Sequence, residues 1–138
     1  MKKKSFVPQT NTVNEIQEFV GHTLMKNKIS SKKIASLELI IEEIITNIVN
    51  YGFKVKSNGV IDIGVDFLNH DMLIEINDNG IAFNPLEKKD PDVDARIDDR
   101  SIGGLGIFLV KQLAKKVDYS RENDKNNLSI IFDIIKET

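Results

Sequence analysis

Two alternating segments constrain the fold of this chain more than any other feature. Residues 60–67 read VIDIGVDF and residues 72–78 read MLIEIND, and apolar residues recur at every second position in both. This period of two is typical of β-strands with one buried face. The short link at residues 68–71 favours an antiparallel hairpin. We therefore expect a sheet whose apolar face is covered by other elements of the chain.

The remaining segments supply helices and further strands. Residues 11–28 have apolar side chains at three- and four-residue spacing and predict an amphipathic helix. A second helix is predicted from a cap at Ser30 or Ser31 to about Asn50, with Gly52 as its stop. We also expect a helix at 105–116 and strands at 5–8, 117–122 and 127–135. This order predicts an α+β fold, with a mostly antiparallel sheet and helices on one face.

The length of 138 residues suits one domain spanning residues 1–138. Within it, residues 79–102 are rich in Asp, Pro, Lys and Arg and show little periodicity. A stretch of this length without regular structure is usually a lid or binding loop. We therefore expect a lid between the second strand of the hairpin and the last helix.

Charge and composition exclude several classes of function. The net charge of -2 gives no global field that favours nucleic acid or an anionic membrane, and Lys2, Lys3 and Lys4 are interpreted as a solvated terminus. The absence of cysteine excludes disulfides and thiolate metal sites. No apolar run approaches the roughly 20 residues of a membrane span, and the signal-peptide pattern is missing. We expect a cytoplasmic protein with no direct nucleic-acid or membrane partner.

The second helix presents two polar side chains beside its apolar face. At about 100° per residue, Glu43 and Asn47 stack one turn apart, next to an edge marked by Ile40 and with Asn50 nearby. They are candidates for base chemistry and ligand binding, whereas Glu42 points to a more exposed side. The alternative is that both are solvated surface residues. The predicted apolar arc consists of Ile34, Leu37, Ile41, Ile44, Ile45 and Ile48.

A carboxylate ends the second alternating strand. Asp78 shares the parity of Met72, Ile74 and Ile76, so its side chain should point inward to the helices. Gly80 follows at a position where a side chain would obstruct a ligand. The alternative is that Asp78 simply starts a turn, because DNG is a strong turn sequence.

Residues 101–111 read SIGGLGIFLVK, with Gly103, Gly104, Leu105 and Gly106 directly before an apolar run. Backbone N–H groups at a helix start attract anions, and glycines would let phosphate oxygens approach. The alternative is a hinge for the lid. The phosphate-loop pattern GxxxxGK[ST] does not occur, and no strand leads directly into these glycines as in the dinucleotide-binding fingerprint.

Together, the three features resemble the GHKL ATPase superfamily. They occur in the order ExxxN, DxG, lid and GGLG, in EEIITNIVNYGF, INDNGIAFNP and DRSIGGLGIFLVKQLAKKVDY. Within the superfamily the chain is most similar to the small anti-sigma factor serine kinases of bacterial partner-switching systems. The likeness spans essentially the whole chain and implies a two-layer Bergerat sandwich.

The resemblance also implies a role for each motif residue. Glu43 matches the general base, and Asn47 matches the ligand of Mg²⁺. Asp78 matches the carboxylate that accepts a hydrogen bond from the adenine amino group, with Gly80 beside it. Gly104 and Gly106 match glycines that contact the phosphates. The expected ATP-binding set further includes Asn50, Ala82, Arg100, Gly103 and Leu105.

Three positions depart from the family pattern or extend it. Ala82 replaces the second glycine of DxGxG, and Tyr51 stands where relatives often have histidine. The expected lid is acidic and contains Arg96 and Arg100. We hypothesise that Arg100 neutralises the γ-phosphate or contacts a partner protein.

The function implied by the resemblance is that of an ATP- and Mg²⁺-dependent serine/threonine kinase. It would phosphorylate an anti-sigma factor antagonist of the STAS type, sequester a sigma factor, or do both, and it would form a homodimer. The alternative is a non-catalytic ATP-binding module that acts by protein binding alone. Glu43 favours the kinase, because a pure binder needs no base. A histidine kinase is disfavoured, since no phosphoacceptor helix pair precedes the domain.

Overall fold

The computed structural model describes residues 1–24, 29–53, 58–87 and 104–135. Within these residues, the helices are α1 (Thr12–Leu24), α2 (Ser31–Asn47) and α3 (Gly104–Leu113). The strands are β1 (Lys2–Phe6), β2 (Ile61–Leu68), β3 (Asp71–Asp78), β4 (Lys116–Glu122) and β5 (Lys125–Asp133). A π-helical turn, Ile48–Gly52, extends α2, and a 3-10 turn, Pro85–Glu87, follows β3.

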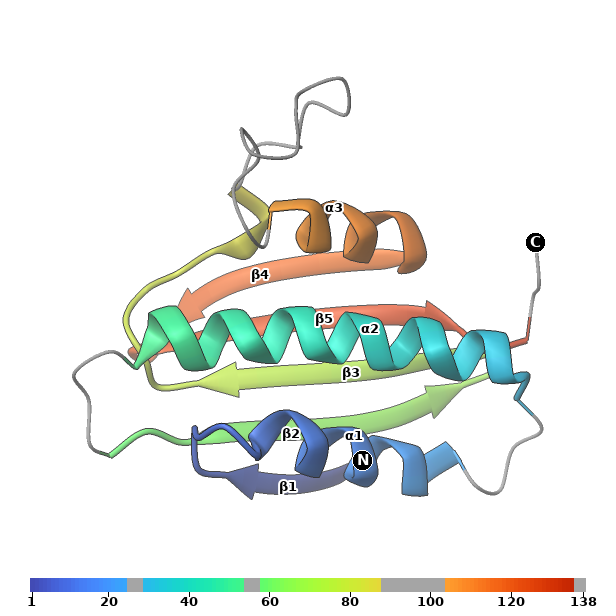
Figure 1. Ribbon diagram of the computed structural model, residues 1–138, viewed down its shortest axis with the longest axis horizontal. Coiled ribbons are helices and arrows are strands. Elements are labelled where there is room, and N and C mark those ends of the chain that lie inside the picture. The colour runs from blue at the N-terminus through green and yellow to red at the C-terminus, as the bar shows by residue number, and fades with distance from the viewer. Residues whose placement is uncertain (25–28, 54–57, 88–103, 136–138) are drawn as a thin grey trace.

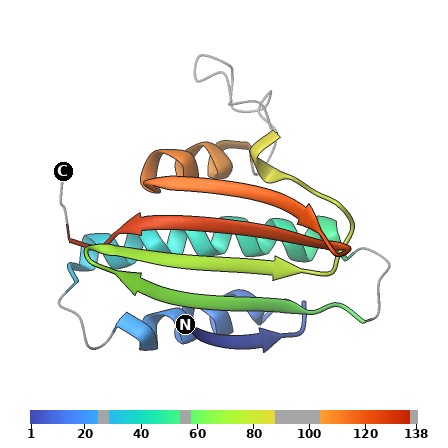
Figure 2. The ribbon, with the colours of Figure 1, turned by 180° about the vertical axis from the view of Figure 1, so that it is seen from behind.

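The strands form one sheet in the order β1-β2-β3-β5-β4, and every neighbouring pair is antiparallel. The three helices lie on one face of this sheet, with α2 across its middle (Figure 1). Seen from behind, the opposite face has no helix in front of it among the described residues (Figure 2). The predicted α+β arrangement of an antiparallel sheet with helices on one face is therefore confirmed.

The core lies between the sheet and the helices because strand alternation sends one apolar row inward. In β3 the buried positions are Met72, Ile74, Ile76 and Asp78, and the residues between them are only partly buried. Strands β2 and β5 flank β3 and send their own buried rows into the same layer. No helix among the described residues is long and apolar enough to cross a membrane.

Several predicted element boundaries are wrong. The first strand is Lys2–Phe6 rather than residues 5–8, so the three lysines lie in an edge strand, where exposed charges are well tolerated. The last helix ends at Leu113 rather than at residue 116, because the Lys115 N–H already donates to the Ile131 carbonyl at 2.7 Å. The final strand begins at Lys125, two residues earlier than predicted.

The buried arc of α2 is also rotated from its predicted position. Ile40 is fully buried, whereas Ile34 is 38% exposed. The reason is that α2 contacts both α1 and α3 as well as covering the sheet, so its centre of burial depends on neighbours that a helical wheel does not contain.

Phe67 was expected in the core but is 36% exposed, near the end of β2.

The two ends of α2 differ in how they are fixed. At the start, the Ser30 side chain accepts a hydrogen bond from the Lys33 N–H at 3.2 Å, which identifies Ser30 as the cap. At the other end, the helix widens into the π-helical turn, a feature often found at functional sites. This turn brings the Gly52 carbonyl to the Ile81 N–H at 3.1 Å.

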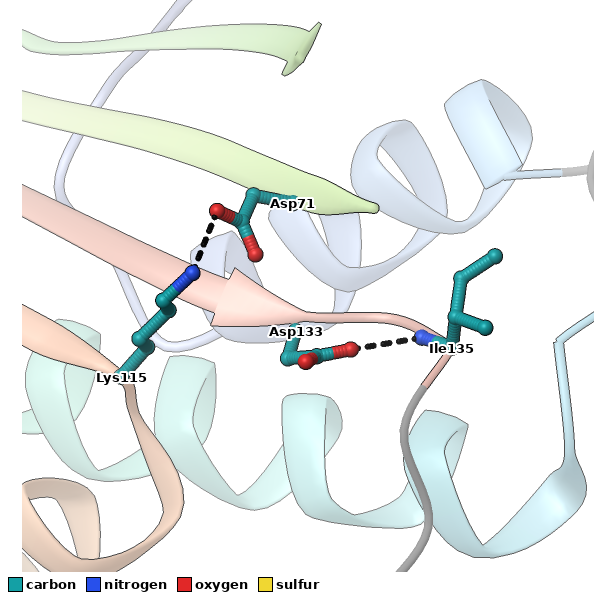
Figure 3. Close-up of polar contacts among 4 residues, drawn as sticks. All are labelled: Asp71, Lys115, Asp133 and Ile135. Atoms are coloured by element: carbon teal, nitrogen blue, oxygen red, sulfur yellow. Dashed lines mark hydrogen bonds and ion pairs between the residues drawn. The ribbon is translucent and has the colours of Figure 1, made fainter. Parts of the chain in front are cut away.

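Asp71 opens β3 at the end of the strand opposite Asp78. Its Oδ2 atom lies 2.9 Å from the Lys115 ammonium (Figure 3). The hydrogen bond to Asp71, and then its charge, raise the pKa of Lys115 above the ordinary value of 10.5. This ion pair ties the segment after α3 to the central strand.

Candidate functional site

The end of α2 brings Glu43 and Asn47 into direct contact. The Asn47 Nδ2 atom donates to the Glu43 side-chain Oε1 at 3.1 Å and to the Glu43 carbonyl at 2.9 Å. Asn47 is 4% exposed and Glu43 is partly buried, whereas Glu42 is exposed. The interpretation of both residues as solvated surface groups is therefore wrong for Asn47.

The inward position predicted for Asp78 is confirmed, since the residue is 3% exposed. Its Oδ1 atom accepts hydrogen bonds from the Gly80 N–H at 2.9 Å and from the Asn126 Nδ2 at 3.0 Å. The first of these bonds closes the turn that the sequence DNG also predicts. The two interpretations of Asp78 are thus compatible, because one buried carboxylate fulfils both.

Gly80 is required by backbone packing. A Cβ atom at this position would lie 2.7 Å from the Gly52 carbonyl oxygen and 3.0 Å from the Asp78 Oδ1 atom. The first neighbour is backbone and cannot swing aside. The glycine therefore lets the segment after β3 approach the end of α2.

Gly106 lies against the carboxylate of Glu43. A Cβ atom at Gly106 would lie 1.9 Å from the Glu43 Cδ atom and 2.1 Å from its Oε2 atom. The first turn of α3 thus meets the acidic flank of α2. The structure brings together Glu43, Asn47 and Gly106 from two helices that the sequence analysis linked only by their order.

Asn126 is a site residue that the sequence analysis missed. It lies opposite Asp78 in the β3–β5 pairing and is 5% exposed. Besides its bond to Asp78, its Nδ2 atom donates to the Ile81 carbonyl at 2.8 Å. Its Oδ1 atom accepts from the Phe83 N–H at 3.1 Å and the Tyr119 hydroxyl at 2.5 Å. The available signal was parity, because Asn126 shares the inward row of the apolar residues of β5.

Two further contacts hold the segment after β3. The Tyr51 ring stacks on the Phe83 ring, with centroids 6.1 Å apart and planes at 24°. The Arg121 guanidinium donates to the Gly80 carbonyl at 2.9 Å. Tyr51 thus contacts the segment after β3 through its ring, although it does not line the hollow described below.

A hollow opens between α2, the π-helical turn and the sheet. Its lining is mostly apolar and includes the polar side chains of Asn47, Asp78 and Asn126 and the hydroxyl of Tyr119. Ligand sites typically combine such apolar walls with a few convergent polar groups. The full lining consists of Ile44, Asn47, Ile48, Gly52, Asp78, Phe83, Pro85, Tyr119, Asn126 and Leu128.

The other predicted site residues are not placed in this hollow. Asn50 and Ala82 are exposed and are not among its lining residues. Gly104 is the first residue of α3 and Leu105 is the second. Arg100 and Gly103 lie outside the described residues, as does most of the expected lid. In the part of the chain that the structure describes, no three His, Asp or Glu side chains gather into a metal-binding cluster.

Comparison with known proteins finds related sequences over most of this chain. Residues 6–132 match the family described as the histidine kinase-like ATPase domain. The serine/threonine-protein kinase BtrW of Bordetella bronchiseptica is 24% identical over 119 residues, which cover 86% of this chain and 84% of that kinase. The serine-protein kinase RsbW of Staphylococcus aureus is 33% identical over 95 residues, which cover 65% of this chain and 60% of that kinase.

Solved structures share the same fold. The catalytic domain of the histidine kinase ThkA matches with a TM-score of 0.56 and 11% identity, over 99% of this chain and 100% of that domain. The RsbU and RsbW domains of a Mycobacterium tuberculosis protein match with a TM-score of 0.65 and 10% identity, over 100% of this chain and 34% of that one. The predicted Bergerat sandwich is confirmed.

Proposed function

This chain belongs to the family of histidine kinase-like ATPase domains, and from that premise we propose that it is an ATP-dependent serine/threonine kinase of a partner-switching system. Its substrate would be a hydroxyl-bearing side chain on an anti-sigma factor antagonist. Its further partner would be a sigma factor, and its working form a homodimer. The relatives named as serine or serine/threonine kinases support this assignment.

The observation that carries the proposal is the convergence of three side chains from distant parts of the sequence. Asn47 and Asp78 line one hollow, and Glu43 is hydrogen-bonded to Asn47 at its margin. Apart from phosphate and metal positions, an ATP site needs three features. These are a polar group that binds the edge of the adenine, apolar walls against the faces of the adenine ring, and a carboxylate near the phosphate that is transferred. The hollow supplies the first two through Asp78 and its apolar lining, and Glu43, hydrogen-bonded to Asn47, supplies the third.

Asp78 is assigned to the adenine. Its carboxylate lies in the buried layer, at the end of β3, where it can accept a hydrogen bond from an exocyclic amino group. A site built around an acceptor discriminates against a base that lacks the matching donor, because a buried polar group would be left unpaired. Guanine has no amino group at the equivalent position, so ATP should be preferred to GTP.

Asn47 is assigned to Mg²⁺, and the residues present fit that ion. Magnesium prefers oxygen ligands and usually keeps several waters and phosphate oxygens, so one amide oxygen from the protein suffices. Because Nδ2 of Asn47 is turned to Glu43, its Oδ1 atom is the one that would coordinate. The bound ion would neutralise charge on the phosphates during transfer.

Glu43 is assigned as the base that receives the proton of the attacking hydroxyl. It is one helical turn from Asn47 and shares a hydrogen bond with it, so the proton acceptor lies next to the phosphate end of the nucleotide. The first turn of α3 lies against the same carboxylate. Its backbone N–H groups, at Gly104 and Gly106, are assigned to the phosphates, and Arg100 to the γ-phosphate or a partner.

One observation favours a non-catalytic ATP-binding module as the second candidate. The Glu43 carboxylate is engaged by Asn47 and packed against Gly106 in this structure. A carboxylate whose role is to hold α2 and α3 together would show the same contacts. In that case the protein would act on its partners by nucleotide-dependent binding alone.

The test combines nucleotide binding with phosphate transfer. Wild type, Glu43→Ala and Glu42→Ala are incubated with labelled ATP, Mg²⁺ and a candidate antagonist domain from the same genome. Glu42 is a matched control because it is adjacent, acidic and exposed. Label transfer by wild type and Glu42→Ala, but not by Glu43→Ala, supports the kinase. ATP binding by all three proteins without transfer supports the binding module, and no ATP binding by wild type refutes both.

A further inference from the structure

The Asn126 side chain makes four hydrogen bonds in the hollow, yet neither the motifs nor the proposed chemistry assigns it a role. It lies on β5 directly opposite Asp78 and is almost fully buried. Resting on the proposed function, we propose that Asn126 is a positioning residue that sets the orientation of the Asp78 carboxylate and thereby determines selectivity for the adenine amino group.

The orientation of the Asn126 amide is determined by its partners. Its Oδ1 atom faces the backbone N–H of Phe83, which can only donate. Its Nδ2 atom faces the carbonyl oxygen of Ile81, which can only accept. In a flipped amide the Nδ2 atom would face the Phe83 N–H, donor against donor, and the Oδ1 atom would face the Ile81 carbonyl, acceptor against acceptor. Only the observed orientation of the amide therefore satisfies both partners.

This fixed amide in turn fixes Asp78. The Oδ1 atom of Asp78 receives two N–H donors, from Asn126 at 3.0 Å and from the Gly80 backbone at 2.9 Å. Both donors require this oxygen to act as an acceptor. Because a carboxylate is planar, anchoring one oxygen from two directions also fixes the direction of the other oxygen. The group that reads the base is thus held before any nucleotide arrives, which lowers the cost of binding.

The same amide connects the site to two further segments. The Tyr119 hydroxyl of β4 donates to its Oδ1 atom, and the segment after β3 bonds to it through Ile81 and Phe83. A substitution at Asn126 therefore removes one of the two donors to the Asp78 Oδ1 atom and, at the same time, the side-chain bonds to the adjoining backbone. It would act on the base end of the hollow and leave Glu43 on α2 without a changed contact.

The experiment measures a ratio of affinities. The Kd values of ATP and of purine riboside triphosphate, which lacks the 6-amino group, are determined by calorimetry for wild type, Asn126→Ala and Asn127→Ala. Asn127 is a matched control, because it is the same residue type one position along β5, its side chain points to the opposite face and its Nδ2 atom donates to the Lys125 carbonyl. Wild type and Asn127→Ala should share one preference for ATP. Asn126→Ala should reduce that preference about tenfold, the worth of one well-oriented hydrogen bond.

The ratio separates positioning from stability. A variant that is merely less folded binds both nucleotides more weakly and keeps its preference, and that result would overturn the proposal. Tyr119→Phe supplies a milder perturbation in case Asn126→Ala does not fold. It removes one donor to the Asn126 Oδ1 atom and should lower the preference about two- to threefold, within the range of a weak hydrogen bond. An unchanged preference in this variant also contradicts the role of Asn126.

The result for wild type distinguishes this inference from the proposed function. If wild type binds ATP and prefers it, but Asn126→Ala keeps the preference, the role of Asn126 fails and the nucleotide site stands. If wild type binds neither nucleotide, the proposed function fails and the role of Asn126 falls with it.

Discussion

The contact between Gly106 and Glu43 predicts a strong coupling between the two positions. Replacing Gly106 with alanine would place a Cβ atom 1.9 Å from the Glu43 Cδ atom, about 1.5 Å short of ordinary carbon–carbon contact. Either the Glu43 side chain swings away or α3 shifts. The first response breaks the hydrogen bond from Asn47 to Glu43, and the second disturbs the packing of α3 on α2.

The magnitude follows from two opposing effects. Overpacking of this kind typically costs about 1–3 kcal/mol. Alanine is favoured over glycine inside a helix by about 1 kcal/mol, which offsets part of that cost. Gly106→Ala should therefore destabilise wild type by about 0–2 kcal/mol. In a Glu43→Ala background the clashing atoms are absent, so the same substitution should stabilise the protein by about 1 kcal/mol.

The assay is chemical denaturation of wild type, both single variants and the double variant. The expected coupling free energy between the two positions is about 1–3 kcal/mol. Gly21 in α1 is the matched control, because a Cβ atom there meets nothing within 4 Å. Gly21→Ala should have the same effect with and without Glu43. An equal effect of Gly106→Ala in the two Glu43 backgrounds would refute the contact on which the reasoning depends.

Three further perturbations test other parts of the structure. The pKa of Lys115 is raised in the folded state, so its pair with Asp71 stabilises the fold fully below pH 10.5 and this stabilisation is lost as the pH rises through the folded-state pKa. The difference in stability between wild type and Lys115→Met should therefore disappear in strongly alkaline buffer. A difference that persists there contradicts the pairing. Ser30→Ala removes the cap of α2 and should cost about 1 kcal/mol in urea denaturation, whereas Ser30→Asp should preserve stability. Gly80→Ala forces a Cβ atom to 2.7 Å from the Gly52 carbonyl and should cost about 1–3 kcal/mol; a stability equal to wild type would show that these two backbone segments do not approach so closely.

The sequence predicted those features that depend on local periodicity. The inward position of Asp78 follows from strand alternation alone, because neighbouring parity determines which face a side chain occupies. The pairing of Glu43 with Asn47 follows equally from helical spacing. Both are confirmed by the buried carboxylate and the hydrogen bond between the two side chains.

Features that depend on several segments at once were missed. The helical wheel of α2 contained no information on α1 and α3, so it placed Ile34 within the apolar arc and Ile40 only at its edge, whereas Ile34 is exposed and Ile40 is fully buried. Asn126 stands in a polar stretch that resembles a turn, and only the register of β5 on β3 places it beside Asp78. The π-helical turn differs from an α-helix by one residue per hydrogen-bonded ring and has no composition signal.

The hydrogen bond from Ile81 to the Gly52 carbonyl joins the two halves of the proposed nucleotide site through main-chain atoms alone. The spacing between the helix that would hold the metal and the strand that would read the base is therefore set in part by backbone contact, and this contact requires that position 80 carry no side chain. The Glu43 carboxylate, by contrast, is held by a side-chain hydrogen bond and by packing against Gly106. On the proposed assignment, loss of that one carboxylate would leave a protein that binds ATP and its partners but transfers no phosphate, with the nucleotide pocket unchanged.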